Sequence, residues 1–316
     1  MLFAVTSGLL IIGAYYLLPA RFTGPSLLAA DAYLKGLEPT IVRTATDDIH
    51  ALNGGEGEPI VFLHGVYARK EHWSPLASEL AADYSVFLID LPGFGENSRL
   101  SGPDYRLSLQ AKKLEGVIDT LGFDRFHIAA NSMGATIGLQ YYSENPERVA
   151  SIAFIGSPLG FDTPVPSDMD IALGRGDRPL VVKNKVEFEE RVEWLFPNSP
   201  FLPTPVLKYW RDQELSDREI VDDIWQYSQD ISDINQPTEI FESVDIPILV
   251  LWCRQDRIFH VSGAAMLKEM QPNSMVSELD DCGHLPMLDR TKLTAENYMR
   301  FLETQGRAET GSNPNQ

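Results

Sequence analysis

The chain has 316 residues, 44% of them hydrophobic, and a formal net charge of −19. This length allows one or two domains, and the apolar content is sufficient for one large core with an insertion. The acidic balance argues against nucleic acid as a partner, because phosphate binding needs clusters of Lys and Arg.

The N-terminal segment is apolar, and its first charged residue is Arg21. A helix of about 20 apolar residues can span a bilayer, and Tyr15 and Tyr16 suit the interface between lipid and water. We therefore predict a single-pass membrane anchor over residues 1–22. A cleaved signal peptide is the alternative, although the segment lacks a positively charged start and Leu18-Pro19-Ala20 is a poor cleavage site.

The charged residues that follow this segment predict on which side of the membrane the rest of the chain lies. Arg21 and Lys35 come next in the chain, and positive residues tend to stay on the cytoplasmic side. The sequence therefore predicts that the rest of the chain is cytoplasmic. If the segment is a cleaved signal, the protein is instead secreted or periplasmic.

An apolar strand is predicted at residues 59–63, and it runs into His64-Gly65-Val66. In serine hydrolases with a parallel sheet, the loop after such a strand supplies one backbone N–H to the oxyanion hole. We assign that role to Val66, with His64 and Gly65 at the substrate site. An ordinary turn at the end of a strand is the alternative.

A second strand, residues 84–89, precedes Asp90 and the glycine-rich turn Pro92-Gly93-Phe94-Gly95. We interpret this turn as structural, with Asp90 holding the backbone of the loop.

Residues 126–142 read as a strand, a short turn at Asn131-Ser132-Met133-Gly134, and a helix. This is the pattern of a nucleophile elbow, in which small residues allow a strained turn and expose the serine. Ala130 stands where the usual motif has its first glycine. We predict Ser132 as the nucleophile and the N–H of Met133 as the second oxyanion donor.

Two further strands supply the remaining candidates. Asp256 follows the buried-type strand 246–253, and His284 follows the strand 274–279. The order serine, acid, histidine is that of α/β hydrolases. In such a triad Ser132 attacks, His284 takes its proton, and Asp256 fixes the tautomer of the imidazole.

The two cysteines, Cys253 and Cys282, are too few to imply a disulfide framework. Both lie near candidate catalytic residues in sequence and could approach one another. We interpret them as reduced core cysteines.

These motifs together resemble the α/β-hydrolase-fold serine esterases and lipases, and most of all the membrane-anchored monoacylglycerol-lipase-like branch. The branch's H-G-x-x-A-x-K-x-x-W pattern matches residues 64–73, and Asn131–Gly134 and Cys282–His284 also match. The resemblance covers about residues 45–160 and 244–303, which we expect to form a mostly parallel sheet flanked by helices. Ala130 and a poorly matching middle region depart from the pattern.

The middle region, residues 161–243, is predicted to form a mostly helical cap inserted in this core. It carries eighteen Asp and Glu against eight Lys and Arg, 8 − 18 = −10, about half of the excess acid. We assign Trp194, Phe196 and Trp210 to an acyl pocket, with ordinary cap core as the alternative. Residues 304–316 are polar and are predicted to form a disordered tail.

Three functions compete at this point. The leading one is hydrolysis of apolar carboxylic esters, such as monoacylglycerols, through an acyl-enzyme. Carbon–carbon bond or thioester hydrolysis on the same triad is the second, and a non-catalytic binding protein of the same fold is the third. The sequence has no metal or nucleotide motif, so no cofactor is expected.

Overall fold

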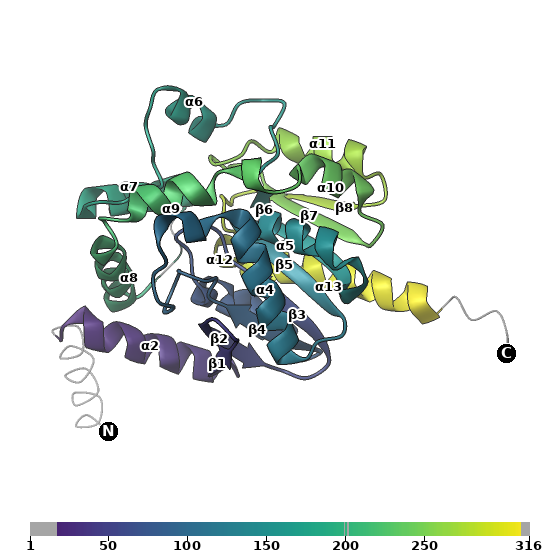
Figure 1. Cartoon of the computed structure of the whole chain (residues 1–316), viewed down its shortest axis with the longest axis horizontal. Coiled ribbons are helices and arrows are strands. Elements are labelled where there is room, and N and C mark those ends of the chain that lie inside the picture. Colours follow the sequence, from purple (N-terminus) through teal and green to yellow (C-terminus); the bar gives the residue numbers. More distant parts are fainter. Residues whose placement is uncertain (1–17, 199, 201, 311–316) are drawn as a thin grey trace, which may run out of the picture.

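The computed structural model describes residues 18–198, 200 and 202–310, and one eight-stranded sheet lies at its centre (Figure 1). The strands are β1 (Glu38–Arg43), β2 (Asp48–Gly54), β3 (Glu58–Leu63), β4 (Tyr84–Ile89), β5 (Phe126–Ser132), β6 (Val149–Pro158), β7 (Ile248–Cys253) and β8 (Met275–Leu279). Their order is β1-β2-β4-β3-β5-β6-β7-β8. β2 is antiparallel to both of its neighbours, and the other pairs are parallel. The predicted mostly parallel sheet is therefore confirmed.

Helices cover both faces of the sheet. One face packs against α3 (Ser74–Leu80), α12 (Pro286–Asp289) and α13 (Thr291–Thr310). The other packs against α4 (Leu107–Leu121), α5 (Met133–Glu144), α10 (Pro237–Ser243) and α11 (Ser262–Met270). As a consequence β5 and β7 are buried along their whole length, as expected for central strands of a parallel sheet.

Short 3₁₀ helices occupy several of the connections between these elements. They are η1 (Lys70–Trp73), η2 (Gly102–Tyr105), η3 (Pro146–Arg148) and η4 (Ile231–Asp233).

The insert between β6 and β7 is helical. It contains α6 (Asp168–Gly174), α7 (Lys185–Leu195), α8 (Thr204–Ser216) and α9 (Val221–Ser228). In Figure 1, α7, α8 and α9 lie to the left of the sheet, and α6 stands apart at the top. α10 belongs to the core layer instead, because Phe241 stacks on Phe154 of β6 with ring centroids 5.8 Å apart. One helix of the core layer, α10, therefore lies within the segment that the sequence assigned to the cap, residues 161–243.

α2 (Ala20–Leu34) precedes the sheet and packs against α8, with Gly24 directly beside Tyr209. The predicted anchor, residues 1–22, lies mostly outside the described residues, which begin at Leu18. Within the described part of the chain, no helix has the length and apolar character needed to cross a membrane.

The C-terminal helix is longer than the sequence predicted. α13 continues to Thr310, whereas a disordered tail was predicted from Thr304. The segment 304–310 has no proline and one glycine, Gly306, so nothing in it forces the helix to end early. The rest of the predicted tail, residues 311–316, lies outside the described residues.

The two cysteines are joined, contrary to the prediction of reduced thiols. Cys253 and Cys282 form a disulfide, and their Cα atoms are 5.3 Å apart. Cys253 ends β7, and Cys282 lies shortly after β8, the parallel neighbour of β7. The pairing of these strands brings together residues that are 29 positions apart in sequence.

Candidate active site

Ser132 lies at the junction of β5 and α5, in the turn that the sequence predicted. Its backbone has φ 52° and ψ −123°, a strained conformation for a residue with a side chain. Gly134 makes the turn possible, because a Cβ there would lie 2.4 Å from the carbonyl oxygen of Leu63. The absence of a side chain at Gly134 therefore lets α5 start against the end of β3.

Asp256 and His284 are hydrogen-bonded to each other. Nδ1 of His284 lies 3.0 Å from Oδ2 of Asp256, and both residues are buried. Oδ1 of Asp256 accepts the backbone N–H groups of Ile258 at 2.8 Å and Phe259 at 3.3 Å. These bonds fix the carboxylate, so that its second oxygen faces the imidazole.

Ser157, which the sequence reasoning missed, belongs to the same group. Its hydroxyl donates to Oδ2 of Asp256 at 2.6 Å and lies 2.9 Å from Nδ1 of His284. It stands near the end of β6, which lies in the sheet between β5, the strand of Ser132, and β7, the strand that precedes Asp256. Only its place at the end of a buried strand could have indicated it.

Ser132 and His284 both line a cavity of about 70 Å³. Asn131 ties their two segments together, because its amide Nδ2 donates to the carbonyl oxygens of Ile155 at 2.9 Å and His284 at 3.1 Å. Most of the remaining wall is apolar and is made by the cap and by the segment after His284, through Leu180, Phe188, Val192, Leu195, Phe196, Leu202, Leu207, Trp210, Leu285 and Leu288. Arg191 and Glu214 of the cap and the loop after β3 line the rest.

The two predicted oxyanion donors lie on neighbouring segments. Met133 is the first residue of α5, and Val66 lies in the loop after β3 and lines the cavity. β3 and β5 are parallel neighbours, so their carboxyl ends meet at one edge of the sheet. The N-terminus of α5 also favours negative charge at this place.

His64 and Gly65, which were both assigned to substrate binding, have different surroundings in the structure. Gly65 lines the cavity, whereas the side chain of His64 is fully buried and bonds only to backbone. Its Nε2 accepts the N–H of Leu91 at 2.9 Å, and its Nδ1 donates to the carbonyl oxygen of Gly65 at 2.7 Å. Burial lowers the pKa of His64 to about 4. The neutral ring therefore orders the loop and does not contact the cavity.

Two of the three predicted cap aromatics line the cavity. Phe196 and Trp210 do so, whereas Trp194 does not. The guanidinium of Arg257 covers the ring of Trp194 instead, at 4.1 Å from its centroid. Periodicity alone did not distinguish these side chains, because all three belong to the same cap segment.

His72 lines the cavity and had no assigned role. Its ring meets Trp210 edge-on with centroids 5.1 Å apart. Burial, followed by the charge of Arg69, lowers its pKa to about 3. The ring is therefore neutral at pH 7.

Asp90 holds a loop, as the sequence predicted. Its carboxylate accepts the backbone N–H groups of Lys70 at 2.8 Å and Glu96 at 2.9 Å, and the Lys70 ammonium at 2.9 Å. Burial raises the pKa of Asp90, but the charges of Lys70 and His64 and the hydrogen bonds from the Glu96 N–H and Lys70 together outweigh it, and the pKa is lowered. Among the described residues, no cluster of three or more His, Cys, Asp or Glu is placed to hold a metal ion.

A family model for the alpha/beta hydrolase fold matches residues 58–291. The chain therefore belongs to the α/β-hydrolase fold family.

Three similar proteins narrow the class. Lipase 1 of Psychrobacter immobilis is 28% identical over 256 residues, which cover 80% of each chain. Monoacylglycerol lipase ABHD6 of Mus musculus is 24% identical, covering 78% of this chain and 76% of the relative. The crystal structure of a membrane phospholipase A superposes with a TM-score of 0.85 at 29% identity, covering 96% of this chain and 98% of that one. The predicted class, a carboxylic ester hydrolase, is confirmed.

Proposed function

We propose that the chain hydrolyses carboxylic esters of apolar acyl chains through Ser132, His284 and Asp256. The observation that carries the proposal is the hydrogen bond between His284 and Asp256, with His284 lining the same cavity as the strained Ser132. A histidine held by a carboxylate beside a serine on such a turn is the arrangement that activates a serine for acyl transfer.

The reaction follows from these positions. Oγ of Ser132 attacks the ester carbonyl, and Nε2 of His284 takes its proton while Asp256 stabilises the imidazolium. The N–H groups of Val66 and Met133 stabilise the oxyanion, and removal of one such donor costs about 3–4 kcal/mol. His284 then protonates the leaving alcohol, and water hydrolyses the acyl-enzyme by the same steps.

The choice of an apolar acyl group is supported by the cavity wall. Its cap side is formed mainly by leucines, valine and the aromatic residues Phe188, Phe196 and Trp210. Buried apolar surface contributes about 0.8 kcal/mol for each methylene group removed from water. Charged acyl groups should be poor substrates, because such a wall solvates them badly.

A lipid ester is the substrate class that this wall and the related lipases support. We further propose that residues 1–22 associate with a membrane, as their composition suggests and as the similarity to a membrane phospholipase A supports. The disulfide favours an oxidising compartment for the catalytic domain. We therefore propose a periplasmic or extracellular side for it, in place of the cytoplasmic side expected from Arg21 and Lys35.

A substrate panel tests this function. The purified protein is assayed with p-nitrophenyl esters of two to eight carbons, monooctanoylglycerol, an acyl thioester and a dienone with a cleavable carbon–carbon bond. A fluorophosphonate probe measures the reactivity of Ser132 directly. We expect ester hydrolysis that rises with chain length. Cleavage of the dienone without esterase activity would support carbon–carbon hydrolysis instead, and no probe labelling would contradict the serine mechanism.

A further inference from the structure

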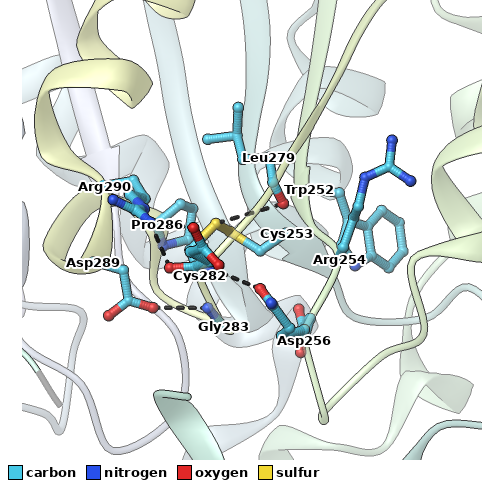
Figure 2. The surroundings of a disulfide bond; sticks show 12 residues. Trp252, Cys253, Arg254, Asp256, Leu279, Cys282, Gly283, Pro286, Asp289 and Arg290 are labelled. Carbon is cyan, nitrogen blue, oxygen red and sulfur yellow. Dashed lines mark hydrogen bonds and ion pairs between the residues drawn. A yellow bond between two sulfur atoms is a disulfide. The ribbon is translucent and has the colours of Figure 1, made fainter. Parts of the chain in front are cut away.

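The disulfide joins the segment after β7, which carries Asp256, to the segment after β8, which carries His284. Figure 2 shows the two cysteines with Asp256 and Gly283 near them. Asp256 comes three residues after Cys253, and His284 comes two residues after Cys282. Both cysteines are fully buried. The covalent bond therefore joins the base of one loop to the base of the other.

Non-covalent contacts hold the histidine loop at three consecutive positions. The N–H of Cys282 donates to Oε1 of Gln255 at 3.0 Å. The N–H of Gly283 donates to Oδ2 of Asp289 at 2.7 Å, as Figure 2 shows. The N–H of His284 donates to the carbonyl oxygen of Leu195 in α7, at 3.0 Å. These bonds orient the backbone, and the Gln255 contact again connects the two loops.

The loop also contains a residue in a strained backbone conformation, which the surrounding contacts must stabilise. Asp281 has φ 57°, a left-handed conformation that costs energy for a residue with a side chain. It directly precedes Cys282, so a covalent bond anchors the chain immediately after the strained residue. Without that anchor the loop could relax, and His284 would move relative to Asp256.

We propose that the Cys253–Cys282 disulfide is a positioning element that keeps His284 and Asp256 in register, so that full activity requires the oxidised enzyme. This inference rests on the proposed function. Neither cysteine lines the cavity, so the disulfide acts on the reacting groups through Asp256 and His284 and leaves the acyl pocket unchanged. Loss of the bond should lower kcat and leave KM nearly unchanged.

The chemistry of the oxidised and reduced forms is simple. A dithiol such as dithiothreitol supplies two electrons and two protons, breaks the S–S bond and becomes a cyclic disulfide. Two thiols remain, at Cys253 and Cys282. Because both sulfur atoms are buried, reduction of the native protein needs transient opening of the loops, and substitution is the more direct test.

The test compares Cys253→Ala, Cys282→Ala and the double variant, with Cys253→Ser/Cys282→Ser as a second pair of similar volume. Each single variant already loses the disulfide, so the double variant should lower kcat no more than either single variant does. We expect kcat for p-nitrophenyl octanoate to fall about 10–100-fold, because a displacement of about 1 Å in a catalytic group can cost that much. KM should stay within about twofold, and the rate of fluorophosphonate labelling should fall in parallel with kcat.

Wild-type protein provides the second measurement, which remains valid if a variant does not fold. Thiol titration should find no free thiol before reduction and two after it. kcat should fall on reduction and recover on reoxidation, with near-ultraviolet circular dichroism showing that the fold persists. Dithiothreitol should not change the activity of the folded double variants.

Different results would separate the two proposals. Full kcat with two titrated thiols, or variants that change KM alone, would overturn the positioning role and leave the esterase proposal intact. Oxidised wild-type protein that neither hydrolyses any ester nor reacts with the fluorophosphonate would instead refute the proposed function.

Discussion

At the scale of single residues, the site depends on side chains whose partners are backbone groups. Asp256 is held by the N–H groups of Ile258 and Phe259, and Asn131 holds the carbonyl oxygen of His284. Both ring nitrogens of His64 likewise form hydrogen bonds to backbone groups. Such bonds fix loops whose reactive side chains must keep their positions, which is what preorganised catalysis requires.

Replacement of the nucleophile tests the core of the mechanism. Ser132→Ala should lower kcat for p-nitrophenyl octanoate by at least about 10⁴-fold, because the covalent step is lost. His284→Ala should be similarly severe, and the double variant should be no worse than Ser132→Ala alone, since the residues act as a unit. Circular dichroism controls for folding. A folded Ser132→Ala protein with near wild-type turnover would remove Ser132 from the mechanism.

Asp289 gives a prediction about stability and pH. Burial raises its pKa from the usual value of 3.8 to about 6, although the Gly283 N–H and Arg290 oppose this shift. The folded state therefore binds the proton more tightly than the unfolded state, and this contribution to stability is lost as the pH rises through about 6. Asp289→Asn keeps an acceptor for Gly283 and removes the charge.

We expect Asp289→Asn to gain melting temperature relative to wild type as the pH rises from 4 to 7. Thermal unfolding of both proteins across this range measures the difference. A difference in melting temperature that does not change with pH would show that Asp289 titrates as it does in the unfolded chain.

At the scale of helices, the cap offers a matched pair of tryptophans. Trp210 of α8 lines the cavity beside Ser132, whereas Trp194 of α7 lies under Arg257 and outside it. In wild type, kcat/KM should climb from acetyl to octanoyl esters, because each buried methylene group contributes up to about 0.8 kcal/mol. Trp210→Ala should flatten that climb and leave acetate hydrolysis nearly unchanged.

Trp194→Ala is the control for this experiment and should keep the wild-type dependence on chain length. The measurement is kcat/KM across the acyl series for all three proteins. Equal flattening by both variants would contradict the assignment of the acyl wall to Trp210.

α2 and α8 meet so closely that a glycine is required. A Cβ at Gly24 would lie 2.3 Å from Cβ of Tyr209. Helix propensity alone predicts that Gly24→Ala stabilises the protein by up to about 1 kcal/mol. We expect the opposite, a loss of about 1–3 kcal/mol from overpacking. Urea unfolding measures it, with Ser26→Ala on the exposed side of α2 as the control. A more stable Gly24→Ala protein would show that α2 does not pack on α8 at this point.

For the molecule as a whole, the sequence predicted the parallel sheet and the order of the candidate catalytic residues. Those features have local signals, such as the apolar run before Ser132 and the motif around it. The disulfide has no such signal, and Ser157 has only its place at the end of a buried strand. Their roles depend on which strands are neighbours in the sheet, and spacing along the chain does not encode that order. For a similar reason the sequence did not show that Trp194 lies outside the cavity, because the direction of its side chain depends on how α7 packs.

The last prediction concerns the N-terminal segment. Every candidate catalytic residue lies after residue 60, whereas the apolar run ends before Arg21. Deletion of residues 1–17 keeps α2, which packs on the cap. The shortened protein should move from the membrane fraction to the soluble fraction, because about 17 apolar residues are close to the length that anchors a helix in a bilayer. Its kcat/KM for p-nitrophenyl acetate should match that of the full chain, since a water-soluble ester needs no membrane. Its activity on monooctanoylglycerol presented in vesicles should fall.

The measurements are fractionation by ultracentrifugation and the two assays, with N-terminal sequencing of the full-length protein as the control. Full-length protein found in the soluble fraction with its N-terminus cleaved near Ala20 would replace the anchor with a signal peptide.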